Sequence, residues 1–229
     1  MLSYAVGGRL VHWQAAGVDT DHAAKGGSPL RGDIPMNRFD TLYRQCADPW
    51  QVRASWYEQR KRAVLLAALP RQHYGRILEL GCGNGEMTRG LASRCDALVA
   101  IDGSETAIAL CALALRQEGI AHVRTHVAQL PDEWPLRPDE SCELVVVSEL
   151  AYYIPDAGLA AFLQRCHDAL APGGEWVMCH YTKDFDDREQ PTSELHARVD
   201  DVGELTRVIA YRDERFQLDI WRKPNKETA

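Results

Sequence analysis

A short apolar strand that runs into three alternating glycines constrains this sequence more than any other feature. Residues 76–80 are followed by Gly81, Gly83 and Gly85. Glycines at such a turn let the backbone bend sharply and approach a ligand, because no Cβ stands in the way. The next apolar run ends at Asp102, and a carboxylate about 20 residues after such glycines can accept hydrogen bonds from ribose hydroxyls. Together these features predict a site for an adenosine-containing cofactor.

The spacing of the glycines distinguishes between adenosine cofactors. A dinucleotide-binding fingerprint, Gly-x-Gly-x-x-Gly, would place its third glycine at position 86. That position is Glu86, whose negative charge would oppose a pyrophosphate at the start of a helix. The sequence therefore disfavours an NAD-dependent oxidoreductase. An ordinary tight turn between strand and helix is the alternative that needs no ligand.

The pattern Glu79-x-Gly81-x-Gly83-x-Gly85 resembles the first motif of the class I S-adenosylmethionine (SAM) methyltransferases. SAM carries no phosphate, so an acid at the helix start is compatible with it. In that family the glycine loop contacts the methionine part of SAM, and an acid after the second strand, matched here by Asp102, binds the ribose. The resemblance implies a SAM-binding set of Glu79, Gly81, Cys82, Gly83, Asp102, Gly103, Gln129, Leu130 and Ser148, with Gln129 and Leu130 where adenine is read.

Alternating strands and helices from residue 76 onward predict a parallel sheet covered on both faces. The expected strands are 76–80, 97–101, 122–127, 143–148 and 175–181, and the expected helices are 86–94, 105–118, 156–170 and 191–201. Two last apolar runs, 205–211 and 216–221, are joined so tightly that they can form only an antiparallel hairpin. A mostly parallel seven-stranded α/β sheet with this hairpin is the Rossmann-like class I methyltransferase fold, expected over 76–225.

The chain before this domain divides into two parts. Residues 1–35 are interrupted by Gly and Pro, which predicts a disordered extension or a start codon assigned too early. Residues 36–75 are expected to form N-terminal helices over the cofactor site, with Asp48 as N-cap and Pro49 in the first position of the second helix. Trp56 and Arg60 share a face of that helix and could cover SAM and bind its carboxylate. The basic run 60–62 is otherwise typical of a solvated face.

Composition limits the partners of the chain. A net charge of −7 argues against nucleic acid, and no apolar run approaches the roughly 20 residues that span a bilayer. Seven cysteines without a Cys-x-x-Cys pair indicate reduced thiols. No His, Asp or Glu cluster has metal-ligand spacing, so we expect no metal. The sequence predicts a cytoplasmic protein with a small-molecule substrate, no membrane partner and a monomeric or homodimeric state.

Catalytic candidates follow the fourth and fifth strands, since ligands of such sheets bind beyond the carboxyl ends of the strands. Glu149 can take a proton from an acceptor amine while Tyr152 and Tyr153 place it. Equally, Glu149 can hold an amino group of the cofactor, with the tyrosines only lining the site. His180 and His196 are candidate bases for a hydroxyl acceptor, although each is also typical of a structural histidine.

Further segments resemble the rhizobial nodulation N-methyltransferase group, which methylates an amine of a chitooligosaccharide. They are 48–52, Trp56-Tyr57-Glu58 with Arg60, and 148–153. The resemblance implies an amine acceptor in an amino sugar or similar metabolite. After the fifth strand, relatives read Cys-His-Trp-Arg-His-Pro where this chain has Cys179-His180-Tyr181-Thr182-Lys183-Asp184. Two alternatives stay open: SAM-dependent alkyl transfer or cyclisation on the same fold, and a non-catalytic SAM-binding partner subunit.

Overall fold

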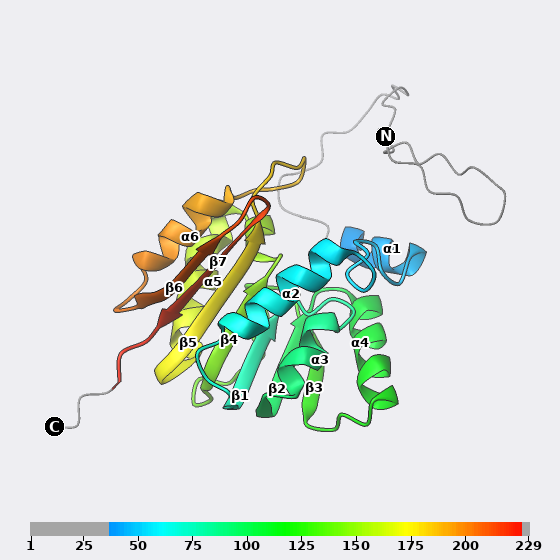
Figure 1. The fold of residues 1–229 in the computed structure, drawn as a ribbon, viewed down its shortest axis with the longest axis horizontal. Helices are drawn as coiled ribbons and strands as arrows, with labels where there is room; N and C mark the ends of the chain where they lie inside the picture. The colour runs from blue at the N-terminus through cyan, green and yellow to red at the C-terminus, as the bar shows by residue number, and fades with distance from the viewer. Residues whose placement is uncertain (1–36, 226–229) are drawn as a thin grey trace. The chain divides into compact units, whose positions relative to one another are not determined.

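The computed structural model describes residues 37–225. These residues form one seven-stranded sheet in the order β3-β2-β1-β4-β5-β7-β6, in which β7 runs opposite to the other six strands (Figure 1). The strands are β1 (Tyr74–Leu80), β2 (Cys95–Asp102), β3 (Val123–Val127), β4 (Cys142–Ser148), β5 (Leu170–Tyr181), β6 (Thr206–Arg212) and β7 (Phe216–Arg222). The expected mostly parallel sheet with a C-terminal antiparallel hairpin is confirmed.

Helices cover both faces of this sheet. They are α1 (Asn37–Gln45), α2 (Trp56–Ala68), α3 (Glu86–Ala92), α4 (Glu105–Gln117), the 3-10 turn η1 (Ala151–Tyr153), α5 (Asp156–Ala169) and α6 (Thr192–Asp200). Consecutive strand residues point to opposite faces, so Ile77 packs in one apolar cluster and Leu78 in the other. The cluster of Ile77 includes side chains of α2, α3 and α4, and that of Leu78 includes those of α5 and α6.

The centre of the sheet places the ends of three strands side by side. Val145, Val146 and Val147 of β4 are fully buried, as expected for a central parallel strand that is covered on both faces. Leu80 at the end of β1 pairs with Ile101 of β2 and with Val147 of β4. The strand order reverses between β1 and β4, which is where open α/β sheets bind ligands.

Two local predictions were wrong. The second helix begins at Trp56 rather than at Pro49, because the Asp48 carboxylate accepts from the N–H groups of Val52 and Arg53 in a separate turn. The helix expected over 156–170 ends at Ala169, and β5, expected to begin at residue 175, begins directly after that helix at Leu170, so residues 172–174 lie within the strand instead of forming a turn.

Residues 1–35, predicted to form an extension, lie outside the described part of the chain. Within 37–225, no helix is both long enough and apolar enough to cross a membrane.

Candidate active site

The glycine loop is held to the end of β2 by the carboxylate of Asp102. Its Oδ2 accepts from the N–H of Gly83 at 2.9 Å, and its Oδ1 accepts from the N–H of Ser104 at 2.9 Å. Burial raises the pKa of Asp102, and the backbone donors of Ser104, Gly83 and Gly103 oppose that rise. The carboxylate therefore stands between the loop and the start of α4, where acceptor positions remain for ribose hydroxyls.

The three glycines adopt backbone conformations that other residues rarely take. Gly81, Gly83 and Gly85 have φ values of 79°, 53° and 88°. A Cβ on Gly81 would lie 3.1 Å from Cβ of Leu150, and a Cβ on Gly85 would lie 2.7 Å from Sγ of Cys111. The loop thus needs glycine both for its conformation and for its close packing. Cys82, between Gly81 and Gly83 in this loop, is buried.

Two buried oxygens near this loop lack a hydrogen-bond partner within the described chain. Oε2 of Glu79 is one, and burial raises the pKa of this carboxyl to about 8, against a hydrogen bond from Thr88. Oε1 of Gln129 is the other, while its Nε2 donates to the carbonyl of Gly103 at 2.9 Å. Such atoms are costly unless a partner arrives. Acceptors at these two positions fit the amino groups of the methionine and adenine parts of SAM.

Helix α1 packs over the loop through residues that the sequence analysis did not single out. A Cβ on Gly83 would lie 2.5 Å from the hydroxyl of Tyr43, which is buried. Oδ1 of Asp40 accepts from the hydroxyl of Ser104 and from the N–H of Thr106, both at 2.9 Å. Asp40 therefore ties α1 to the start of α4, beside the glycine loop.

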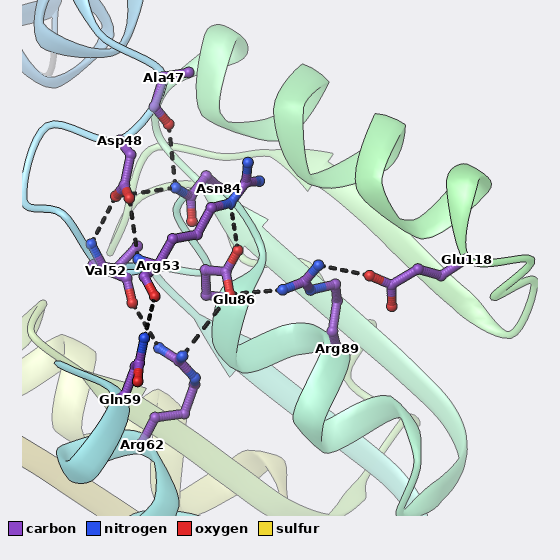
Figure 2. Close-up of polar contacts among 10 residues, drawn as sticks. All are labelled: Ala47, Asp48, Val52, Arg53, Gln59, Arg62, Asn84, Glu86, Arg89 and Glu118. Atoms are coloured by element: carbon purple, nitrogen blue, oxygen red, sulfur yellow. Dashed lines mark hydrogen bonds and ion pairs between the residues drawn. The ribbon is translucent and has the colours of Figure 1, made fainter. Parts of the chain in front are cut away.

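Glu86 forms ion pairs with arginines of the connection before α2 and of α2 itself, as Figure 2 shows. Its side chain is only 7% exposed and faces three guanidinium groups. The nearest nitrogens of Arg53, Arg62 and Arg89 lie 2.6, 3.9 and 2.7 Å from its oxygens. Beside it, Asn84 donates to the carbonyl of Ala47 at 3.1 Å. The acid at the start of α3 thus joins α3 to the 46–55 connection and to α2.

Glu149 follows β4 in a left-handed conformation with φ of 56°, which is unusual for a residue other than glycine. Its Oε1 lies 3.0 Å from Nζ of Lys61, and its Oε2 accepts from the hydroxyl of Tyr152. The side chain of Glu149 is 28% exposed, whereas Tyr152 is buried. Ser148, at the end of β4, is half-buried. Lys61 and Tyr152 thus orient the Glu149 carboxylate from two sides, while the side chain stays partly exposed.

Aromatic rings cluster at the loop that carries this carboxylate. Tyr152 and Tyr153 pack edge to face, with centroids 4.6 Å apart. The ring centroid of Phe185 lies 5.0 Å from that of Tyr152, and the ring centroid of Phe39 in α1 lies 5.0 Å from that of Tyr153. These contacts bring helix α1 and the 182–191 connection together around the loop after β4. Apolar rings beside a carboxylate suit a small acceptor with one polar group.

His180 belongs to a buried chain of hydrogen bonds beneath that loop. The N–H of Ala151 donates to Nε2 of His180 at 3.2 Å, so this nitrogen carries no proton. Nδ1 of His180 then donates to Nε2 of His196 at 2.9 Å, and Nδ1 of His196 donates to Asp219 at 2.7 Å. Burial lowers the pKa of His180 well below its ordinary value, and His196 and Lys61 add to that effect. Neither histidine has a free nitrogen for an acceptor proton.

The structure leaves Trp56 exposed and pairs Arg60 with the β6–β7 hairpin. Trp56 is 74% exposed at the start of α2. The guanidinium of Arg60 forms an ion pair with Asp213 and donates to the hydroxyl of Tyr211 at 2.9 Å, both at the β6–β7 hairpin. Leu130 packs against the cluster of α5, beside Gln129. Among residues 37–225, no group of three His, Cys, Asp or Glu side chains is arranged to hold a metal ion.

The basic run 60–62 was wrongly expected to be a solvated face. Lys61 is 4% exposed and pairs with Glu58 as well as with Glu149. The spacing of Glu58 and Lys61, three apart on one helix, is the signal that could have revealed this pair.

Comparison with known proteins identifies the family to which this chain belongs. Residues 77–174 match a family model described as a methyltransferase domain. A solved protein from Pseudomonas syringae, described as a candidate methyltransferase, is 36% identical with a TM-score of 0.64, and the match covers 74% of this chain and 100% of the other. The chain belongs to the class I SAM-dependent methyltransferases.

Other relatives agree with this family. The methyltransferase is 30% identical to Nodulation protein S of Sinorhizobium fredii over 146 residues, which are 62% of this chain and 65% of that protein, just under two thirds. The N-methyltransferase NodS of Bradyrhizobium japonicum, solved with S-adenosylhomocysteine, is 24% identical with a TM-score of 0.71 over 82% of this chain and 100% of the other. The second likeness shows the fold alone.

Proposed function

We propose that this methyltransferase transfers a methyl group from SAM to an amine nitrogen of a small molecule. The observation that carries the proposal is the contact between the glycine loop and the residue after Glu149. A Cβ on Gly81 would lie 3.1 Å from Cβ of Leu150, so the cofactor loop and the Glu149 carboxylate border the same end of the sheet. An acceptor held by Glu149 would therefore stand beside the methionine part of SAM.

The cofactor residues of the proposal are those whose geometry fits SAM. Asp102 would hold the ribose hydroxyls, Gly81 and Gly83 would admit the methionine backbone, and Glu79 and Gln129 would accept from its two amino groups. Tyr43 supports the proposal that residues 36–75 cover this site, because its hydroxyl contacts the loop at Gly83. Arg60 is left out of the set, since its guanidinium is already paired with Asp213 at the β6–β7 hairpin.

The acceptor is inferred from the base that the site offers. Bound SAM supplies an electrophilic methyl group, so the protein has mainly to align the acceptor and remove its proton. A carboxylate can hold an ammonium group and take its proton, whereas a hydroxyl acceptor needs a stronger base. Both nitrogens of His180 are engaged in hydrogen bonds. The likeness to Nodulation protein S motivates the choice of an amine, because the solved NodS of Bradyrhizobium japonicum is named as an N-methyltransferase.

Product analysis tests this proposal. The purified protein is incubated with SAM and a panel of probe acceptors: glucosamine, N-deacetylated chitotetraose, a catechol and a dicarboxylic acid. We expect S-adenosylhomocysteine and an N-methylated amine. Methylthioadenosine would instead indicate transfer of another part of SAM, and methylation of the catechol alone would contradict the amine assignment. Calorimetry showing NAD bound more tightly than SAM would overturn the cofactor assignment.

A further inference from the structure

Lys61 is a buried ammonium between two carboxylates. It lies on α2 with 4% of its surface exposed. Its Nζ is 2.9 Å from an oxygen of Glu58 and 3.0 Å from Oε1 of Glu149. The ring of Tyr57 covers a further side, with its centroid 5.0 Å from Nζ. A lysine is almost never this buried unless it is paired, so the two carboxylates account for its position.

Glu149 needs outside support for its conformation. A non-glycine residue in the left-handed region persists only where its surroundings hold it there. Lys61 on α2 holds one oxygen of its carboxylate and Tyr152 in η1 holds the other. These two contacts come from different elements, so together they fix the direction of the carboxylate.

We propose that Lys61 is a positioning residue whose ammonium group balances the charge of the Glu149 carboxylate and directs it at the acceptor nitrogen, with Glu58 holding Lys61 in place. The inference rests on the proposed function, in which Glu149 receives the acceptor amine. Lys61 is not itself the proton acceptor. Burial alone would lower its pKa, but Glu149 and Glu58 outweigh burial and raise the pKa of Lys61 above its ordinary value.

Lys61 carries the positive charge that contacts the Glu149 carboxylate. The titratable and charged groups that face the Glu149–Lys61 pair come from α2, η1 and β5, and they are Tyr57, Glu58, Tyr152, Tyr153, Cys179 and His180. None of these is a cation, because His180 is neutral in its hydrogen-bonded chain. The guanidinium of Arg38 on α1 lies over the ring of Tyr153 and pairs with Asp187. Removing the ammonium therefore leaves Glu149 beside the Glu58 carboxylate without a cation from residues 37–225 in contact with it.

A titration without substrate tests this directly. Glutamate labelled with ¹³C at the side-chain carboxyl is followed by NMR against pH in the wild-type protein, in Lys61→Met and in Lys61→Arg, and Glu149→Gln identifies the signal. We expect Lys61→Met to raise the pKa of Glu149 by about 1–3 pH units, the range for losing an opposite charge at this distance. Lys61→Arg should restore it to near the wild-type value. An unchanged Glu149 titration in Lys61→Met overturns the proposal.

Two further variants complete this titration, one in case Lys61→Met does not fold and one as a control. Lys61→Met combined with Glu58→Gln removes the carboxylate that the single change would leave unpaired, so it keeps the titration possible if Lys61→Met does not fold. Lys223→Met is the matched control, because the Lys223 ammonium donates to the carbonyls of His167 and Leu170, away from the site. It should leave the Glu149 signal unchanged.

Kinetics with glucosamine or N-deacetylated chitotetraose as the acceptor give a second measurement. Lys61→Met should lower kcat about tenfold to a hundredfold, as expected for a misplaced reacting group, and leave SAM affinity within about twofold. Added to Glu149→Gln, the change should have less than about a twofold further effect, because both act through one carboxylate. Equal losses in both backgrounds would overturn the proposal. A wild-type protein that methylates no probe amine would instead contradict the proposed function, while the titration still decides the role of Lys61.

Discussion

The guanidinium of Arg53 lies 2.6 Å from the carboxylate of Glu86, the residue that stands where a dinucleotide-binding loop has its third glycine. The same charge that disfavours a pyrophosphate at the start of α3 joins that helix to the segment before α2. This pairing, together with the contact of Asp40 with the start of α4, places the N-terminal helices beside the glycine loop. Substrate access and cofactor retention are therefore expected to depend on these polar contacts.

Removing the Glu86 charge should destabilise the fold. Glu86→Gln leaves the guanidinium groups of Arg53, Arg62 and Arg89 without their shared anion, and we expect a loss of about 1–3 kcal/mol in the free energy of unfolding. Urea denaturation measures it. Glu118→Gln is the control, because Glu118 is 44% exposed and meets only Arg89 of this group. Its effect should stay within about 0.5 kcal/mol, and equal losses in the two variants would contradict the role of Glu86.

Asp102→Ala should weaken SAM binding by about 1–3 kcal/mol, the range for hydrogen bonds to a charged group. The change also removes the acceptor of the Gly83 and Ser104 N–H groups, so thermal unfolding must first show a folded protein. Isothermal calorimetry with SAM gives the affinity. Asp96→Ala, on the same strand but with its side chain 75% exposed, should leave it unchanged. A folded Asp102→Ala with wild-type affinity would disprove the ribose assignment.

Glu149→Gln should separate the two roles considered for this carboxylate. If Glu149 takes the acceptor proton, turnover with a probe amine falls by about a hundredfold or more while SAM affinity is kept. Steady-state kinetics and calorimetry on the same sample measure both quantities. Glu143→Gln, at the opposite end of β4, should change neither. A loss of SAM affinity in Glu149→Gln would show that the carboxylate holds an amino group of the cofactor.

The buried histidine chain predicts a pH dependence of stability. Below about pH 6.5 the unfolded chain binds a proton at His180 that the folded protein does not, because burial keeps its pKa well below that value. Folding stability should therefore fall as the pH falls, by up to about 1.4 kcal/mol per pH unit relative to His180→Gln. The glutamine amide can still accept from Ala151 and donate to His196, so this variant keeps the chain of hydrogen bonds.

The measurement is urea denaturation of both proteins at pH 7.5, 6.5 and 5.5. Glu79 acts with the opposite sign, because its pKa is raised to about 8 and its protonated form favours folding as the pH falls. Both proteins contain Glu79, so its effect cancels in the comparison. Parallel stability curves for wild type and His180→Gln would show that His180 does not titrate as the structure indicates.

Much of the fold followed from short-range patterns. The apolar runs, the glycines at 81, 83 and 85, and the acid at 102 are local features, and strand periodicity is enough to order them. The start of α2 could not be read in this way, because Asp48 caps a turn with Val52 and Arg53 instead of a helix. The same residue type serves either structure, and the surrounding packing selects between them.

The sequence by itself determined the SAM-binding frame, because strand, glycine loop and Asp102 have fixed spacing along the chain. Only the tertiary structure decided the partners of the charged and titratable residues around it. Arg60 meets Asp213, 153 residues away, and His196 of α6 meets Asp219 of β7. Lys61 on α2 forms an ion pair with Glu149 after β4, and no spacing in the sequence predicts this pair. Local geometry is encoded by neighbours in sequence, whereas the pairing of buried charges depends on which elements the folded core brings together.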